Sequence, residues 1–118
     1  MYETILIVED EECIRELFHD ELRDNHYKVI TAENGVEALK IIEEKMPDLI
    51  ILDIKLPDVT GTEILSNIRQ YNTEVPVIVC TAILSPKLRI FFYRWANAIV
   101  TKPVDMDLLL REVKELLV

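Results

Sequence analysis

The sequence predicts an α/β fold: a single doubly wound domain in which helices cover both faces of a five-stranded parallel sheet. Three observations support this prediction. Short apolar runs rich in β-branched residues alternate five times with longer stretches of helical periodicity. The apolar runs are continuous rather than alternating, as is typical of strands buried on both faces. The chain length of 118 residues suits one domain, and right-handed strand–helix–strand crossovers would place the helices on both sides of the sheet.

The predicted strands are the apolar runs, and most of them end abruptly in a polar residue. One run mixes polar and apolar residues, so we expect this run at an edge of the sheet. This mixed run is residues 27–32. The five predicted strands are residues 4–8, 27–32, 49–52, 75–80 and 98–101.

The predicted helices carry apolar residues three or four positions apart, which places these residues on one face. Asn34 is a predicted N-cap. Thr60 followed by Glu63 is a capping-box pattern, and Ser85-Pro86 combines a cap with a proline at the first helical position. The five predicted helices are residues 11–25, 34–44, 60–71, 85–95 and 105–117.

The composition excludes several functions. The chain has 13 basic and 22 acidic residues and a net charge of −9, which argues against binding nucleic acid or anionic lipid by charge. No apolar run approaches the roughly 20 residues of a membrane span, and no basic segment precedes the first apolar run, so we expect no signal peptide. Cys13 and Cys80 are too few for a disulfide framework. We therefore expect a cytoplasmic protein with reduced thiols.

The residues that end four of the strands are the main functional signal. Glu9 and Asp10 follow the first strand, Asp53 the third, Thr81 the fourth and Lys102 the fifth. A parallel sheet brings these ends to one edge, where ligands of such folds bind. Three carboxylates, one hydroxyl and one ammonium are therefore expected to form a single site.

This set of groups suits phosphoryl transfer. Three close carboxylates repel one another, so one of them tends to hold a proton unless a cation is bound. Mg²⁺ favours one or two carboxylates together with water and phosphate oxygens. A carboxylate can attack phosphorus and form an acyl phosphate, while a metal, an ammonium and a hydroxyl share the charged oxygens.

The chain resembles the receiver domain of response regulators, the CheY-like family of two-component signal transduction, over essentially its whole length. Each matching motif alone would be weak, but all of them occur in order at the normal spacing. They are Glu9-Asp10, the segment 32–39, the segment 53–61 (Asp-Ile-Lys-Leu-Pro-Asp-Val-Thr-Gly), Thr81-Ala82 and Lys102-Pro103.

The resemblance implies a flavodoxin-like sheet of order 2-1-3-4-5 and a role for each site residue. Asp53 would be the phosphoacceptor. Asp10 and Asp53 would bind Mg²⁺ through their carboxylates, the Lys55 backbone carbonyl would be the third protein ligand, and Glu9 would act through water. The protein would not be a conventional enzyme, although it would catalyse its own phosphorylation and dephosphorylation.

The resemblance also implies the changes that follow phosphorylation. Lys102 would pair with the phosphoryl group, Thr81 would reorient toward it, and the peptide bond before Pro103 would be cis. In this family the position of Ile99 is usually aromatic and that of Trp95 is usually small. These departures predict that the switch works mainly through the aromatic helix at 85–95. About half of the aromatic side chains of this helix would pack in the core, and the rest would form a contact patch.

The partners implied by the resemblance are a histidine kinase or phosphotransfer protein and a downstream effector or output domain, with a phosphorylation-dependent dimer as a further expectation. The chain would be either a stand-alone receiver or one cut from a longer protein. The kinase would dock on the first helix and the loop after the fifth strand, most strongly at Ile14 and Val104. Leu17 or Phe18, together with Pro103, are the other candidates.

Three other hypotheses about the function fit parts of this pattern. An aspartate-nucleophile phosphohydrolase would need a second aspartate two residues after the nucleophile, where this chain has Lys55. A flavodoxin-like electron carrier would need Ser, Thr and Gly in its first loop, where residues 9–12 are all acidic. A receiver-like interaction module that is never phosphorylated is the third alternative, and the complete five-residue site argues against it.

Overall fold

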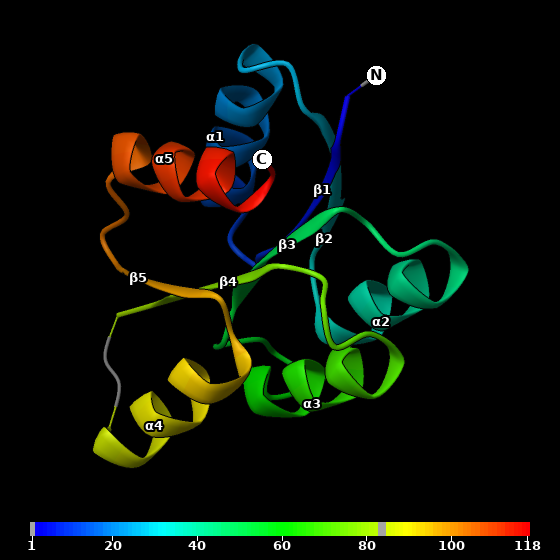
Figure 1. Ribbon diagram of the computed structural model, residues 1–118, viewed down its shortest axis with the longest axis vertical. Helices are drawn as coiled ribbons and strands as arrows, with labels where there is room; N and C mark the ends of the chain where they lie inside the picture. Colours follow the sequence, from blue (N-terminus) through cyan, green and yellow to red (C-terminus); the bar gives the residue numbers. More distant parts are fainter. Residues whose placement is uncertain (1, 83–84) are drawn as a thin grey trace.

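The chain alternates strictly between strands and helices (Figure 1). The computed structural model describes residues 2–82 and 85–118. The strands are β1 (Thr4–Val8), β2 (Lys28–Ala32), β3 (Leu49–Asp53), β4 (Val77–Thr81) and β5 (Ala98–Thr101). The helices are α1 (Glu12–Asp24), α2 (Gly35–Glu44), α3 (Gly61–Tyr71), α4 (Pro86–Trp95) and α5 (Met106–Leu116).

The five strands form one sheet in the order β2-β1-β3-β4-β5, and every neighbouring pair is parallel. This confirms the predicted fold class, the sheet order and the edge position of the second strand. All residues of β3 and β4 are buried, as their continuous apolar sequences predict. No helix among the described residues is long and apolar enough to cross a membrane.

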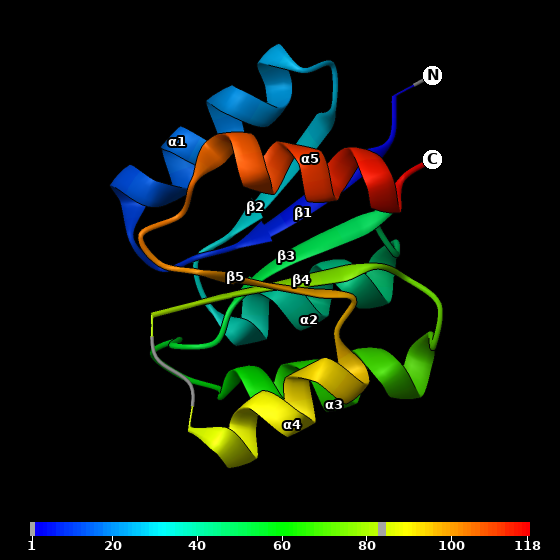
Figure 2. The ribbon, with the colours of Figure 1, turned by 60° about the vertical axis from the view of Figure 1, so that its left-hand side comes forward.

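The sheet separates two hydrophobic cores. Helices α1 and α5 cover one face, and α2, α3 and α4 cover the other (Figure 2). Alternate residues of each strand point into opposite cores: in β1, Leu6 packs with the α2–α4 side and Ile7 with the α1–α5 side. Within Pro86–Trp95 of α4, only Phe92 is buried, whereas Ile90 and Tyr93 are exposed.

The predicted helix caps are present. The Asn34 side chain accepts a hydrogen bond from Glu37 N, the Thr60 hydroxyl accepts one from Glu63 N, and the Ser85 hydroxyl accepts one from Leu88 N. These side chains satisfy backbone donors that a helix leaves unpaired in its first turn.

The start of β4 differs from the prediction. The strand begins at Val77 rather than Val75, because Pro76 has no N–H to donate to a neighbouring strand. The Pro76 carbonyl still accepts a hydrogen bond from Ile50 N. The strand also includes Thr81, which was expected to follow it.

Candidate functional site

The five predicted site residues lie at the carboxyl edge of the sheet, on the left in Figure 2. Asp53 and Thr81 are the last residues of β3 and β4. Glu9 and Asp10 directly follow β1, and Lys102 directly follows β5. Because β1, β3, β4 and β5 are consecutive neighbours in the sheet, their ends form one continuous site.

Lys102 connects the two buried carboxylates of the site. Its Nζ lies 3.2 Å from Glu9 Oε1 and 3.2 Å from Asp53 Oδ2. Glu9 is 1% exposed and Asp53 is 4% exposed. A lone buried carboxylate would be strongly destabilising, so the ammonium group is the counter-ion that keeps this acidic edge together.

One lysine does not balance the carboxylates that surround it. Burial, followed by the hydrogen bond and negative charge of Asp53, raises the pKa of Glu9 from 4.5 to about 7. Although burial opposes it, the charges of Asp53 and Glu9 raise the pKa of Lys102, so the lysine stays protonated. Without a bound cation, a proton on Glu9 relieves the repulsion in part, as the sequence led us to expect.

The carboxylates fit a hard divalent cation. Glu9, Asp10 and Asp53 each offer an oxygen, and these oxygens lie within 4.8 Å of one another. Asp10 is exposed and therefore accessible from solvent, whereas Glu9 and Asp53 are buried. Oxygen ligands that leave room for several waters are those that Mg²⁺ favours.

The backbone of Lys55 lies beside the phosphoacceptor candidate. Lys55 N donates a hydrogen bond to Asp53 Oδ1 at 3.1 Å. The two carboxylate oxygens of Asp53 therefore have different partners, since Oδ2 accepts from Lys102. This arrangement fixes the orientation of the carboxylate and leaves its remaining lone pairs for a ligand.

The site opens into a cavity of about 620 Å³. Its polar wall includes Asp10, Asp53, Thr81 and Lys102, and its apolar wall includes Phe92 of α4. Asp53, Lys102 and Thr81 therefore line one space, and α4 borders the same space through Phe92. A tetrahedral phosphoryl group could contact all of these polar residues.

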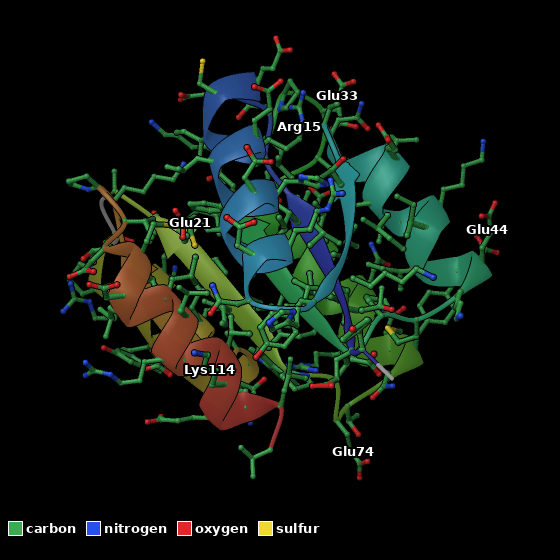
Figure 3. The ribbon with its side chains drawn as sticks, turned by 90° about the horizontal axis from the view of Figure 1, so that it is seen from above. Arg15, Glu21, Glu33, Glu44, Glu74 and Lys114 are labelled. Atoms are coloured by element: carbon green, nitrogen blue, oxygen red, sulfur yellow. The ribbon has the colours of Figure 1, made fainter. Side chains whose placement is uncertain are left out.

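Arg15 contacts the backbone of the acidic pair, a contact that the sequence did not indicate. Its guanidinium donates to the backbone carbonyls of Glu9 at 3.0 Å and Asp10 at 3.3 Å. Figure 3, seen from above, places Arg15 at the same end of the molecule as Glu33, which follows β2, and opposite Glu74. In the sequence, only one feature could have indicated this contact: Arg15 is a basic residue five positions after Asp10, early in the helix that follows the acidic pair.

The surface expected to dock a kinase is partly available. Ile14 and Val104 are half-buried, and Leu17 is 49% exposed. The alternative candidate Phe18 is 2% exposed and packs in the α1–α5 core. Phe18 is therefore excluded, because the face of α1 that carries it is turned to the sheet. The Lys102–Pro103 bond is cis, as expected.

The comparisons with known proteins agree with this architecture. The family model of the response regulator receiver domain matches residues 5–114. The chain is similar to the alkaline phosphatase synthesis transcriptional regulatory protein PhoP of Bacillus subtilis, with 44% identity over 82 residues, which are 70% of this chain and 34% of that protein. It is also similar to the polar-differentiation response regulator DivK of Brucella anthropi, with 32% identity over 99% of this chain and 98% of that protein.

A solved structure has the same fold. A CheY-like response regulator receiver domain protein from Methanospirillum hungatei superposes with a TM-score of 0.95 at 33% identity, covering 99% of this chain and 94% of that chain. This chain belongs to the response regulator receiver domain family of two-component systems. The matched residues cover about a third of the length of PhoP and half the length of the mycobacterial response regulators MprA.

Proposed function

We propose that residues 1–118 act as a receiver whose Asp53 accepts a phosphoryl group from a histidine kinase or phosphotransfer protein in a Mg²⁺-dependent reaction. The observation that carries this proposal is the contact of Lys102 with Asp53 and Glu9, beside the carboxylate of Asp10. These groups can orient a nucleophilic carboxylate and cancel the charge of an incoming phosphoryl group.

In the proposed reaction an oxygen of Asp53 attacks phosphorus and the bond from phosphorus to the donor breaks. For a phosphohistidine donor this is a P–N bond, and the imidazole leaves with its electron pair and takes up a proton. Lys102 turns from the free carboxylate to the new phosphoryl oxygens, and Thr81 donates its hydroxyl to them. Asp10, Asp53 and the Lys55 carbonyl would hold Mg²⁺, with Glu9 acting through water, and the ion would neutralise charge on the transferred group.

The same proposal covers release and output. Water attack on the acyl phosphate would return Asp53 and inorganic phosphate, so the domain would catalyse its own dephosphorylation without being a conventional enzyme. Movement of Thr81 would change the wall of the cavity that α4 shares. We infer that α4 shifts and that a downstream effector, an output domain or a second phosphorylated copy reads this shift.

The partners follow from the family and the surface. Ile14 of α1 and Val104 after β5 are the proposed kinase-docking residues, with exposed Leu17 in place of Phe18. The net charge of −9 and the acidic site make nucleic acid and anionic membranes poor partners for this domain. We place the reaction in the cytoplasm, as its family relationship suggests.

The proposal is tested with a small phosphodonor, which removes the need for a cognate kinase. Incubation with acetyl phosphate and Mg²⁺ should add one phosphoryl group to the intact mass of the chain. The adduct should be absent from Asp53→Asn. In the wild-type chain it should form with Mg²⁺ and should not form when a chelator removes the metal. An adduct that persists in Asp53→Asn, or no adduct in the wild-type chain, would contradict the proposed function.

A further inference from the structure

The loop between β3 and α3 is fastened to the start of α2 by one carboxylate. Asp58 Oδ1 accepts a hydrogen bond from Gly35 N at 2.9 Å, and Asp58 Oδ2 accepts one from Val36 N at 3.0 Å. Asp58 Oδ1 also accepts from Val59 N at 2.8 Å within the loop. We call the contact of Asp58 with Gly35 and Val36 the Asp58 clasp.

The packing around the clasp leaves little freedom. A Cβ added to Gly35 would lie 2.7 Å from Val59 Cβ, so the backbone of α2 lies directly against the loop. The two ends of the loop also contact each other, because Gly61 N donates to the Ile54 carbonyl at 3.2 Å. A Cβ added to Gly61 would lie 2.5 Å from Ile54 Cα. The loop is therefore closed between its own two ends and held against α2 near its C-terminal end.

Lys55 lies within this fastened loop and contacts the reacting carboxylate. Its N–H donates to Asp53 Oδ1, while its side chain is exposed. Ile54 and Leu56, on either side, pack against the core. A displacement of the loop would move the N–H that orients Asp53 and the carbonyl proposed to bind Mg²⁺ together, because both belong to the same residue.

We propose that Asp58 is a positioning residue for the phosphoryl-transfer site: by holding the loop against α2, it sets the place of the Lys55 backbone relative to Asp53. This inference rests on the proposed function, which it extends to a residue that does not line the site cavity. Loss of a group hydrogen-bonded directly to a metal ligand weakens metal binding about 10–100-fold. Asp58 acts on the Lys55 carbonyl only through the loop, so we expect an effect at or below the lower end of this range.

The experiment compares Asp58→Ala with a matched control, Asp48→Ala. Asp48 is also exposed and also accepts a hydrogen bond from a backbone N–H, that of Thr4, at 2.7 Å. It precedes β3 at the opposite edge of the sheet. Both substitutions remove a carboxylate that caps backbone donors, so a purely structural role would make their effects alike.

Three readouts apply to each variant: the Lys55 amide shift in metal-free protein, Mg²⁺ affinity by calorimetry, and the rate of labelling by acetyl phosphate at saturating Mg²⁺. Asp58→Ala should shift the Lys55 amide, weaken Mg²⁺ binding by up to about tenfold and slow labelling. Asp48→Ala should leave all three unchanged, although it lowers stability. Asp58→Asn keeps one acceptor oxygen and should fall between wild type and Asp58→Ala.

A second variant tests the same claim without touching the carboxylate. Gly35→Ala pushes against Val59 from the other side of the contact, so it should also shift the Lys55 amide and weaken Mg²⁺ binding. Amide shifts confined to residues 35, 36 and 59, or Mg²⁺ affinity in Asp58→Ala equal to that in Asp48→Ala, would overturn the inference. Failure of the wild-type chain to bind Mg²⁺ or become labelled would instead overturn the proposed function, and the Lys55 amide shift would still decide whether Asp58 positions the loop.

Discussion

Replacing Glu9 by glutamine should stabilise the metal-free protein by an amount that grows with pH. A folded-state pKa of about 7 against an ordinary value of 4.5 means that folding favours the protonated carboxyl. The folded state therefore binds more protons than the unfolded state between these two values, so stability falls as pH rises through this window. One pKa unit corresponds to about 1.4 kcal/mol, so the full penalty is about 3 kcal/mol above pH 7.

Glutamine is a suitable replacement because it has the shape of glutamate and keeps an oxygen that can accept from Lys102. The gain in unfolding free energy of Glu9→Gln over wild type should be about 1 kcal/mol at pH 5 and about 3 kcal/mol at pH 8. Urea unfolding in the presence of a chelator measures both values. A difference that does not change with pH, or a variant that becomes relatively less stable at pH 8, would refute the account of carboxylate crowding.

Three further predictions concern the surroundings of the site. Trp95, at the end of α4, should change its fluorescence when beryllofluoride and Mg²⁺ bind, and unchanged emission at saturation would contradict the proposed shift of α4. Backbone hydrogen bonds, of which the one from Gly35 N–H has the largest effect, lower the pKa of the Asp58 carboxyl from its ordinary value of 3.8. The Asp58 clasp should therefore be present at pH values above 3.8 and be lost as the pH falls through the lowered pKa. A carboxyl carbon titration by NMR checks this, and an ordinary midpoint would count against the clasp. Charged residues at Ile14 and Val104 should block transfer from the kinase while acetyl phosphate labelling continues, and equal loss of both would indicate a damaged fold instead.

Much of the fold follows from local sequence patterns. Continuous apolar runs predicted buried strands, and Thr60 and Ser85 predicted where helices begin, because a cap and its helix are neighbours in sequence. The edge that collects Glu9, Asp53 and Lys102 was also predictable, since parallel strands place their carboxyl ends together. These features depend on residue type and order alone.

Contacts between distant segments were not predictable in the same way. The Asp58 clasp joins residues more than 20 positions apart, and no periodicity indicates which loop aspartate faces a helix. Arg69 of α3 similarly donates to the carbonyls of Trp95 at 2.8 Å and Val75 at 2.7 Å and to the side chain of Asn97 at 3.1 Å. This contact anchors the end of α4 to α3, and only the folded arrangement shows it.

The faces of α1 show a second limit. Leu17 and Phe18 are adjacent apolar residues, and both fit the helical spacing. The rotation of the helix on the sheet buries Phe18 and exposes Leu17, and this rotation depends on the packing of α1 with the sheet and α5. The raised pKa of Glu9 also depends on tertiary packing, because its largest cause is the burial of the carboxyl group.

The central claim is that Asp53 itself carries the phosphoryl group, and reduction of the labelled chain tests it most directly. Borohydride reduces an aspartyl phosphate to homoserine, which changes the mass of the peptide that contains the modified residue. After labelling with acetyl phosphate and Mg²⁺, the homoserine should be found at position 53 and not at Asp10 or Asp58. Homoserine at another position, or an unreduced peptide from a fully labelled chain, would contradict the account.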